Sequence, residues 1–98
     1  MDRISCKKHI INGELLLAVC DFDLLGKEFE EGNVFLSIKK NFYFEEKEYS
    51  NDEIINLLKQ CKHATIAGKN AVNLTKKTFS DITIQTIKQI PFTVLVKG

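Results

Sequence analysis

The dipeptide Asn12-Gly13 limits the fold of this chain more than any other feature of the sequence. A two-residue type I′ hairpin turn needs positive φ at both central residues, and Asn-Gly adopts this conformation readily. Ile11 and Glu14 then face each other, and each step outward pairs the next residue on either side. The sequence therefore predicts a β-hairpin at the start of the chain, with its pairing register fixed by the turn.

This register separates the side chains of the hairpin onto two faces, because successive residues of a strand point to opposite sides. One face is apolar apart from Lys8 and Asp21 and is expected to meet the core; it carries Ile4, Cys6, Ile10, Leu15, Leu17 and Val19. The other face is mixed and is expected to be partly solvated; it carries Ser5, Lys7, His9, Glu14, Leu16 and Cys20. Since Cys6 and Cys20 fall on opposite faces, no disulfide is expected between them.

The segment from Asp21 to Gly32 is predicted to be a connection with one helical turn. We expect Asp23 to cap the free amides of residues 24–26, and Gly26 to end the turn in the left-handed region. Alternating apolar residues then predict a third strand over 33–39. The aromatic run Phe42-Tyr43-Phe44 is expected to continue as strand or sheet edge.

The second half of the chain begins with a capping-box pattern, Ser50 followed by Glu53. An apolar stripe with helical spacing follows it, so the sequence predicts a helix over 51–62. A short β-branched run predicts a buried strand over 63–67.

A second helix is expected over 70–78, with Asn70 as its N-cap. Residues 82–87 are expected to be extended. Pro91 restricts the residue before it to extended conformations and precedes a final alternating strand.

Strands joined by hairpins, with the helices late in the chain, favour an α+β fold. We predict a two-layer sandwich, in which a mixed, mostly antiparallel sheet with an N-terminal β-hairpin has two helices packed on one face. The strand over 63–67, the helix after it and a later strand are expected to form a parallel right-handed crossover. Ninety-eight residues, 44% of them hydrophobic, predict one domain over residues 1–98.

The opening residues lack the charged and then apolar order of a signal peptide, and no apolar run is long enough to span a bilayer. We therefore expect a cytoplasmic protein that does not contact a membrane. Cys6, Cys20 and Cys61 are an odd number of cysteines, and we expect them to be reduced and partly buried.

The charges are unevenly distributed along the chain, although the formal net charge is only +1. Residues 1–49 carry 7 basic and 10 acidic side chains, whereas residues 50–98 carry 7 basic and 3 acidic ones. A surface with two signs orients a protein on a charged partner. The candidates for contact with nucleic acid are therefore lysines of the second half: Lys62, Lys69, Lys76 and Lys77.

Several short segments resemble the archaeal family known as domain of unknown function 424. The strongest are Val19-Cys20-Asp21, Leu25-Gly26-Lys27 and Phe29-Glu30-Glu31-Gly32, and the Phe42-Tyr43 pair and Ile90-Pro91 extend the similarity over essentially the whole chain. The resemblance implies no assigned reaction, and it groups the protein with archaeal information processing. Relatives often carry a histidine after the proline, where this chain has Phe92-Thr93, so no role is expected to rest on that histidine.

The resemblance makes the acidic loop a candidate site, formed by Asp21, Asp23, Gly26, Lys27, Glu31 and Gly32. A second candidate is the strand-to-helix junction of Gly68, Lys69 and Asn70, where exposed amides and a lysine could hold an anion, or which is simply a capped helix entry. The acidic loop opens like a calcium loop, but it lacks an oxygen ligand at the fifth position and has Gly32 at the twelfth, where a glutamate is required. The cysteines and histidines lack the spacing of a zinc site. We expect no catalytic residue, no metal and no cofactor.

Three functions are consistent with these features. The first is a non-enzymatic binding module that contacts RNA or a ribonucleoprotein in translation-related assemblies through the lysine-bearing surface. The second is a small enzyme or ligand-binding protein with its site between the loop from Asp21 to Gly32 and the helix start from Gly68 to Asn70. The third is a protein–protein adaptor that uses a sheet edge or the acidic loop. The sequence predicts no particular oligomeric state.

Overall fold

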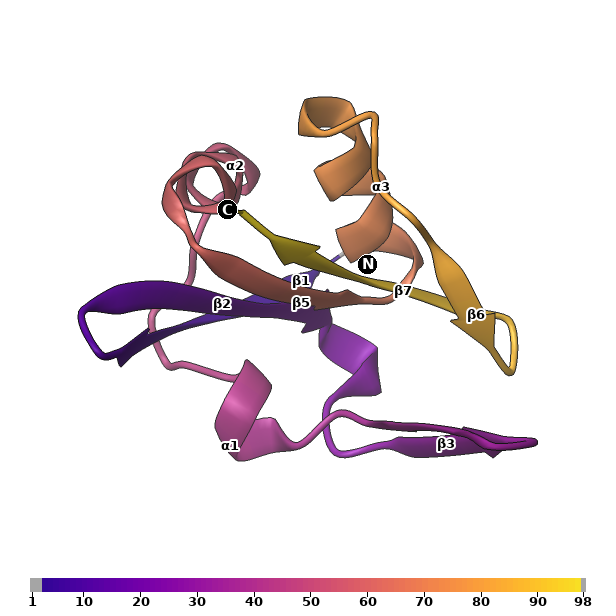
Figure 1. Ribbon diagram of the computed structural model, residues 1–98. Coiled ribbons are helices and arrows are strands. Elements are labelled where there is room, and N and C mark those ends of the chain that lie inside the picture. The colour runs from indigo at the N-terminus through magenta and orange to yellow at the C-terminus, as the bar shows by residue number, and fades with distance from the viewer. Residues whose placement is uncertain (1–2, 98) are drawn as a thin grey trace.

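The computed structural model describes residues 3–97 (Figure 1). Its elements in chain order are β1 (Ile4–Ile11), β2 (Glu14–Asp21), the 3₁₀ turn η1 (Phe22–Leu24), β3 (Glu28–Glu31), β4 (Val34–Ser37), α1 (Lys40–Tyr43), α2 (Asn51–Gln60), β5 (His63–Ala67), α3 (Lys69–Thr78), β6 (Gln85–Ile87) and β7 (Ile90–Val96). Five strands form a sheet in the order β1-β2-β5-β7-β6, and β3 pairs separately with β4. The prediction of an α+β fold with a mixed, mostly antiparallel sheet is therefore confirmed.

The N-terminal hairpin has the predicted register. Ile11 lies opposite Glu14, and the pairing continues outward to Ile4 opposite Asp21. Asn12 and Gly13 have φ values of 53° and 79°, as a type I′ turn requires. The turn dipeptide therefore fixes which side of the sheet every residue of β1 and β2 faces.

The parallel contact of the sheet lies between β2 and β5. We expected β5, the helix after it and a later strand to form a parallel crossover. The strand that follows α3 is β6, which runs in the same direction as β5, but β7 lies between them and pairs antiparallel with both. The physical reason is the β6–β7 hairpin, which turns the chain back into the gap beside β5.

Helices α2 and α3 cover one face of the sheet, above it in Figure 1. The apolar side of β1 and β2 packs there against the helices, through Cys6, Leu17, Val19, Ile54, Leu58, Ala71, Val72 and Leu74. The predicted capping box of α2 is present, since Ser50 Oγ accepts from the Glu53 amide at 3.1 Å and Glu53 Oε1 accepts from the Ser50 amide at 2.8 Å. This face is the core that the sequence predicted, with one correction: Ile10 is 68% exposed, because it lies near the hairpin tip, beyond the helices that cover the rest of the face.

The opposite face of the sheet is mixed and partly solvated, as expected, but the end of it that carries Ala18 and Cys20 is enclosed. Ala18 and Cys20 are 0% exposed there. They pack with Ala67 of β5 in a second apolar cluster. Its other buried members come from the segment between β2 and α2 and are Leu24, Ile38 and Tyr43. Figure 1 shows α1 and β3 below the sheet, opposite α2 and α3. The small side chains of Ala18 and Ala67 leave room for this lower layer to approach the sheet.

Residues 42–44 are not a strand, contrary to prediction. Lys40–Tyr43 form the single helical turn α1, in which the Lys39 carbonyl accepts from the amides of Phe42 and Tyr43, both at 3.0 Å. The turn rotates Tyr43 under the sheet, where it is 6% exposed. Burial of this large ring therefore outweighs the preference of aromatic residues for strands.

Across residues 3–97, none of the helices combines the length and the apolar character needed to cross a membrane.

Candidate functional site

The junction of β2, β5 and α3 brings the two candidate loops together. Because β2 and β5 are parallel neighbours, Asp21 at the end of β2 lies beside Gly68 at the end of β5. Asp21 Oδ1 accepts from the Ala71 amide at 2.8 Å, and Oδ2 accepts from the Asn70 amide at 3.1 Å. The carboxylate of Asp21 thus caps α3 from a distant part of the chain.

Gly68 is the residue that makes this contact possible. Its φ is 106° and its ψ is 153°, a backbone conformation that side-chain-bearing residues rarely adopt. A Cβ at this position would lie 2.4 Å from Cγ of Asp21. Glycine is therefore required both by the backbone and by the carboxylate that lies against it.

Two capping predictions are corrected here. Asn70 is not the N-cap of α3, because the helix begins one residue earlier and Gly68 occupies the cap position, without a side-chain cap. Asp23 does not cap η1, whose first turn has no side-chain capping bond. At both helix starts, the side chain expected to accept a hydrogen bond from the first turn does not do so. At α3 the carboxylate of Asp21 accepts these bonds instead.

The remaining residues of the acidic loop lie away from this junction, along the hairpin of β3 and β4. Gly26 and Gly32 have positive φ at turns, 82° and 61°. Lys27 is exposed, and Glu31 Oε1 accepts from the Lys88 amide at 3.2 Å, which ties the hairpin to the β6–β7 turn. Of the six loop candidates, Asp21 therefore contacts the junction of Gly68 to Asn70. Glu31 instead bonds to the turn between β6 and β7.

The candidate lysines lie on or near α3. Lys69, Lys76 and Lys77 are exposed on that helix, and Lys62 is partly buried between α2 and β5. Helix α3 contains no acidic residue. Within residues 3–97 these four lysines take part in no ion pair, which leaves their ammonium groups to solvent.

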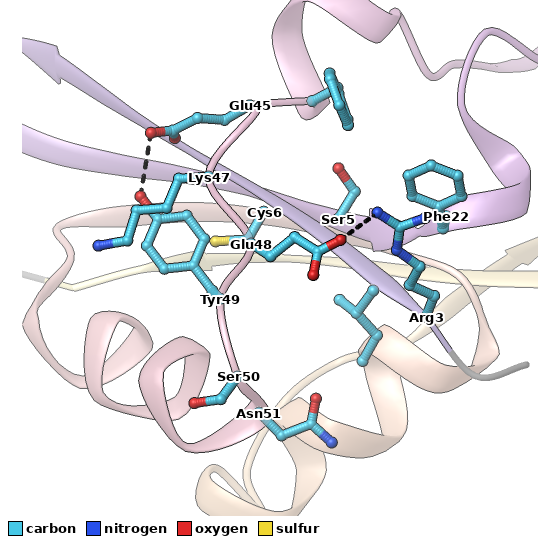
Figure 2. Close-up of a pocket in the computed structure, with 12 residues that line it drawn as sticks. Arg3, Ser5, Cys6, Phe22, Glu45, Lys47, Glu48, Tyr49, Ser50 and Asn51 are labelled. Carbon is cyan, nitrogen blue, oxygen red and sulfur yellow. Dashed lines mark hydrogen bonds and ion pairs between the residues drawn. The ribbon is translucent and has the colours of Figure 1, made fainter.

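A cleft that the sequence did not predict lies between the start of β1 and the loop before α2 (Figure 2). Its volume is about 210 Å³. Arg3 lines it, with its guanidinium 3.9 Å from the ring centre of Phe22 and 2.6 Å from Glu48 (Figure 2). Arg3 is the single arginine of the sequence, and no other feature of the local sequence indicates the cleft.

The cleft has nucleophilic atoms, but they are not activated. Burial, with a smaller contribution from Glu45, raises the pKa of the Cys6 thiol to about 12. Ser5 Oγ donates to the Tyr43 carbonyl at 2.7 Å. Neither histidine lines the cleft, and the nearby carboxylate of Glu45 raises the pKa of Cys6 rather than lowering it.

Burial acts on the other two thiols in the same direction. Burial raises the pKa of Cys20 to about 12, with Asp21 adding to the effect, and it also raises the pKa of Cys61. All three cysteines are free and buried. In the part of the chain that the structure describes, no group of three histidine, cysteine or acidic side chains is placed to hold a metal ion.

A second hollow, of about 490 Å³, lies beside α1 and is lined by His9, Ser37, Lys39, Asn41, Phe42 and Tyr43. The His9 and Phe42 rings are stacked with centroids 4.5 Å apart. His9 Nε2 is also 2.8 Å from the Phe42 carbonyl oxygen. The imidazole is therefore held by packing and a backbone contact, and it lies opposite Leu16, four residues from Cys20 along β2.

Comparison with known proteins agrees with the fold. No curated protein matches the chain. The crystal structure of an uncharacterized conserved protein from Methanopyrus kandleri is similar, with a TM-score of 0.75 and 21% sequence identity over 98% of this chain and 95% of that one. At this identity the similarity concerns the fold alone. The family model for the protein of unknown function DUF424 matches residues 9–97. The chain therefore belongs to the DUF424 family, as its sequence motifs suggested.

Proposed function

We propose that this protein is a non-enzymatic binding module that contacts the RNA backbone through the exposed face of α3. The observation that carries the proposal is the charge of that helix: three exposed lysines, no acidic residue, and no ion pair to these lysines within residues 3–97. Ammonium groups that are not already paired bind phosphates with release of counterions. The grouping of the family with archaeal information processing favours RNA as the polyanion.

The distribution of charge between the two layers supports this orientation. Residues 50–79, which include both helices above the sheet, carry five lysines and two acidic residues. Residues 22–48, which form the layer below it, carry seven acidic residues and four lysines. Figure 1 shows that the two layers lie on opposite sides of the sheet. Such a molecule approaches a polyanion with α3 in front.

The lack of activated groups supports binding over catalysis. The buried thiols have raised pKa values, and the junction amides of Asn70 and Ala71 already donate to Asp21. An anion at this junction would have to compete with a carboxylate of the same chain. The lysines of α3 have no such internal competitor.

The test is a titration of the full chain against a labelled single-stranded RNA at several salt concentrations. Three lysine contacts predict that log K falls with log salt with a slope of about −2. The triple variant Lys69→Gln, Lys76→Gln, Lys77→Gln is expected to abolish detectable binding at moderate salt. The matched control is Lys27→Gln, Lys40→Gln, Lys47→Gln, which removes the same charge from the lower layer.

Equal loss in the two triple variants would show that only net charge matters, and the proposed α3 surface would be rejected. Binding that does not depend on salt, or no binding at low salt, would reject RNA as the partner.

A further inference from the structure

The hairpin of β3 and β4 presents an aromatic ring to solvent. Phe35 is 59% exposed, and it is the one exposed aromatic side chain within residues 3–97. Phe29 and Leu36 face the other way and pack against the lower apolar cluster. Because side chains alternate along a strand, the residues that share the outer side with Phe35 follow from the pairing. We call these residues the hairpin face: Glu28, Glu30, Phe35 and Ser37.

Two carboxylates lie beside the ring on this face. Glu30 is directly opposite Phe35 in the pairing of the strands, which places their Cβ atoms about 5 Å apart. Glu28 is one step further along, and its Oε2 lies 3.5 Å from Ser37 Oγ. Both glutamates are exposed, and within residues 3–97 neither takes part in an ion pair. The face therefore presents a ring beside two negative charges that the described chain does not neutralise.

Other rings of this chain show what occupies such an arrangement. The guanidinium of Arg3 lies 3.9 Å from the ring centre of Phe22 and 2.6 Å from Glu48 (Figure 2). Ammonium groups lie over three further rings, in the pairs Lys40–Phe44, Lys47–Tyr49 and Lys97–Phe79. In the described part of the chain, no cation lies over Phe35. Phe35 and Glu30 thus supply the ring and the carboxylate of the Arg3 arrangement, without its cation.

We propose that the hairpin face binds an arginine-bearing segment of another protein, with a guanidinium stacked on Phe35 and bonded to Glu30. A guanidinium makes both contacts at once, because its flat side covers a ring while its edge donates to a carboxylate. An ammonium is compact and strongly hydrated, so it gains less from the ring. The hairpin lies below the sheet in Figure 1, on the opposite side from α3. The inference does not depend on the proposed binding of RNA.

The charges of the molecule favour a basic protein over other occupants. A second copy of this chain offers no spare arginine, because Arg3 is the single one and already contacts Phe22 and Glu48. A nucleic acid or an anionic lipid surface would meet Glu28 and Glu30, and like charges brought together in a contact are unfavourable. Both glutamates instead attract a segment that carries positive charge.

The hairpin face continues into the hollow beside α1, because Ser37 lines that hollow. The hollow has a volume of about 490 Å³, and the stacked rings of His9 and Phe42 also line it. Side chains two residues apart on an extended segment are about 7 Å apart and point to the same side. A segment with its arginine on Phe35 can therefore place an apolar side chain in the hollow. Exposed Lys39 at the hollow disfavours a second arginine there, which fixes the direction of the segment.

The experiment is a titration of the isotope-labelled full chain, followed by its amide resonances, with an oligoarginine peptide and with an oligolysine peptide of equal length. We expect both peptides to shift the resonances of β3 and β4. The arginine peptide is expected to bind about threefold more tightly, because only arginine gains fully from stacking on the ring.

Two variants separate the ring from the charge. Phe35→Ala is expected to lower the affinity for oligoarginine about threefold, to that for oligolysine. Val34→Ala is its matched control, because Val34 is also exposed on β4 but points to the other side of the hairpin. The variant Glu28→Gln, Glu30→Gln is expected to weaken both peptides about fivefold. The control Glu14→Gln, Glu46→Gln removes the same charge from exposed positions elsewhere.

Thermal unfolding of each variant checks that the fold is kept. The proposal is overturned by equal affinities for the two peptides that Phe35→Ala leaves unchanged, by an equal loss in the Glu14→Gln, Glu46→Gln control, or by shifts confined to other surfaces. Resonances of the hairpin face that shift with the concentration of the chain alone, or on addition of single-stranded RNA, would assign the face to a second copy or to nucleic acid and would also overturn it.

Discussion

The two helices above the sheet begin in different ways. Helix α2 is capped by its own residues, because Ser50 and Glu53 exchange hydrogen bonds within a single turn. Helix α3 starts at a glycine and is capped by Asp21, which is 50 residues away from Ala71 in the sequence. The first cap exists wherever this sequence forms a helix, whereas the second exists only after β2 and β5 have paired. The start of α3 therefore depends on the tertiary fold, and that of α2 does not.

The strongest way to break this comparison is Gly68→Ala. The added Cβ would lie 2.4 Å from Cγ of Asp21, and the backbone φ of 106° is unfavourable for alanine. Overpacking costs about 1–3 kcal/mol, and a residue held in this region of the backbone map costs about 1–3 kcal/mol more. We expect the free energy of unfolding to fall by about 4 kcal/mol. Urea denaturation followed by circular dichroism measures it; a loss below about 1 kcal/mol would show that the carboxylate moves aside freely.

Asp21→Ala is expected to have the next largest effect. It leaves the amides of Asn70 and Ala71 without their acceptor at a buried helix start. Hydrogen bonds to charged groups contribute about 1.5–3 kcal/mol each, and water replaces part of that loss, so we expect a fall of about 3 kcal/mol in the free energy of unfolding. The same urea titration measures it.

Combining the two substitutions sharpens the test, because the alanine methyl then no longer meets a carboxylate. The double variant is expected to be more stable than the sum of the single losses predicts, which is the sign of direct contact in a double-mutant cycle. Strict additivity would contradict the packing of Asp21 against Gly68.

Ser50→Ala tests the local cap and should cost less. The Ser50 hydroxyl accepts one exposed amide bond, and loss of an N-cap serine costs about 1 kcal/mol. The reciprocal bond also lowers the pKa of Glu53 below its usual value, so at neutral pH the capping carboxylate is ionised. Urea denaturation at neutral pH measures the change. An effect as large as that of Asp21→Ala would remove the distinction between the two helix starts.

The same distinction explains how much of the structure could be predicted. Asn12-Gly13 and Ser50 with Glu53 act through neighbouring residues, and the elements they specify formed as expected. The cap of α3 and the cleft at Arg3 both join residues far apart in sequence, the latter by the pairing of Arg3 with Glu48. No local pattern encodes such contacts. The helical turn of α1 was missed for the related reason that burial of Tyr43 under the sheet overrides local preference.

The two hairpin turns also differ in whether their own residues favour the observed conformation. A substitution in one of them gives the smallest change in stability that we predict. Lys88 and Gln89 have φ values of 50° and 67°, the same positive region as Asn12 and Gly13, without the residues that favour it. The left-handed conformation costs about 1–2 kcal/mol for an ordinary residue, and a glycine at the same position avoids this cost. Glycine also makes the unfolded chain more flexible, which destabilises the folded state by about 0.5–1 kcal/mol. Gln89→Gly is therefore expected to raise the free energy of unfolding by about 0.5 kcal/mol.

The measurement for Gln89→Gly is thermal unfolding beside the control Gln85→Gly, which places the same substitution in the strand β6 and should destabilise it. If both variants lose stability, the β6–β7 turn is not strained, and its conformation would have to be attributed to contacts such as that of the Lys88 amide with Glu31. A gain in Gln89→Gly alone would show that this hairpin, like the start of α3, is imposed by the surrounding fold and opposed by its own residues.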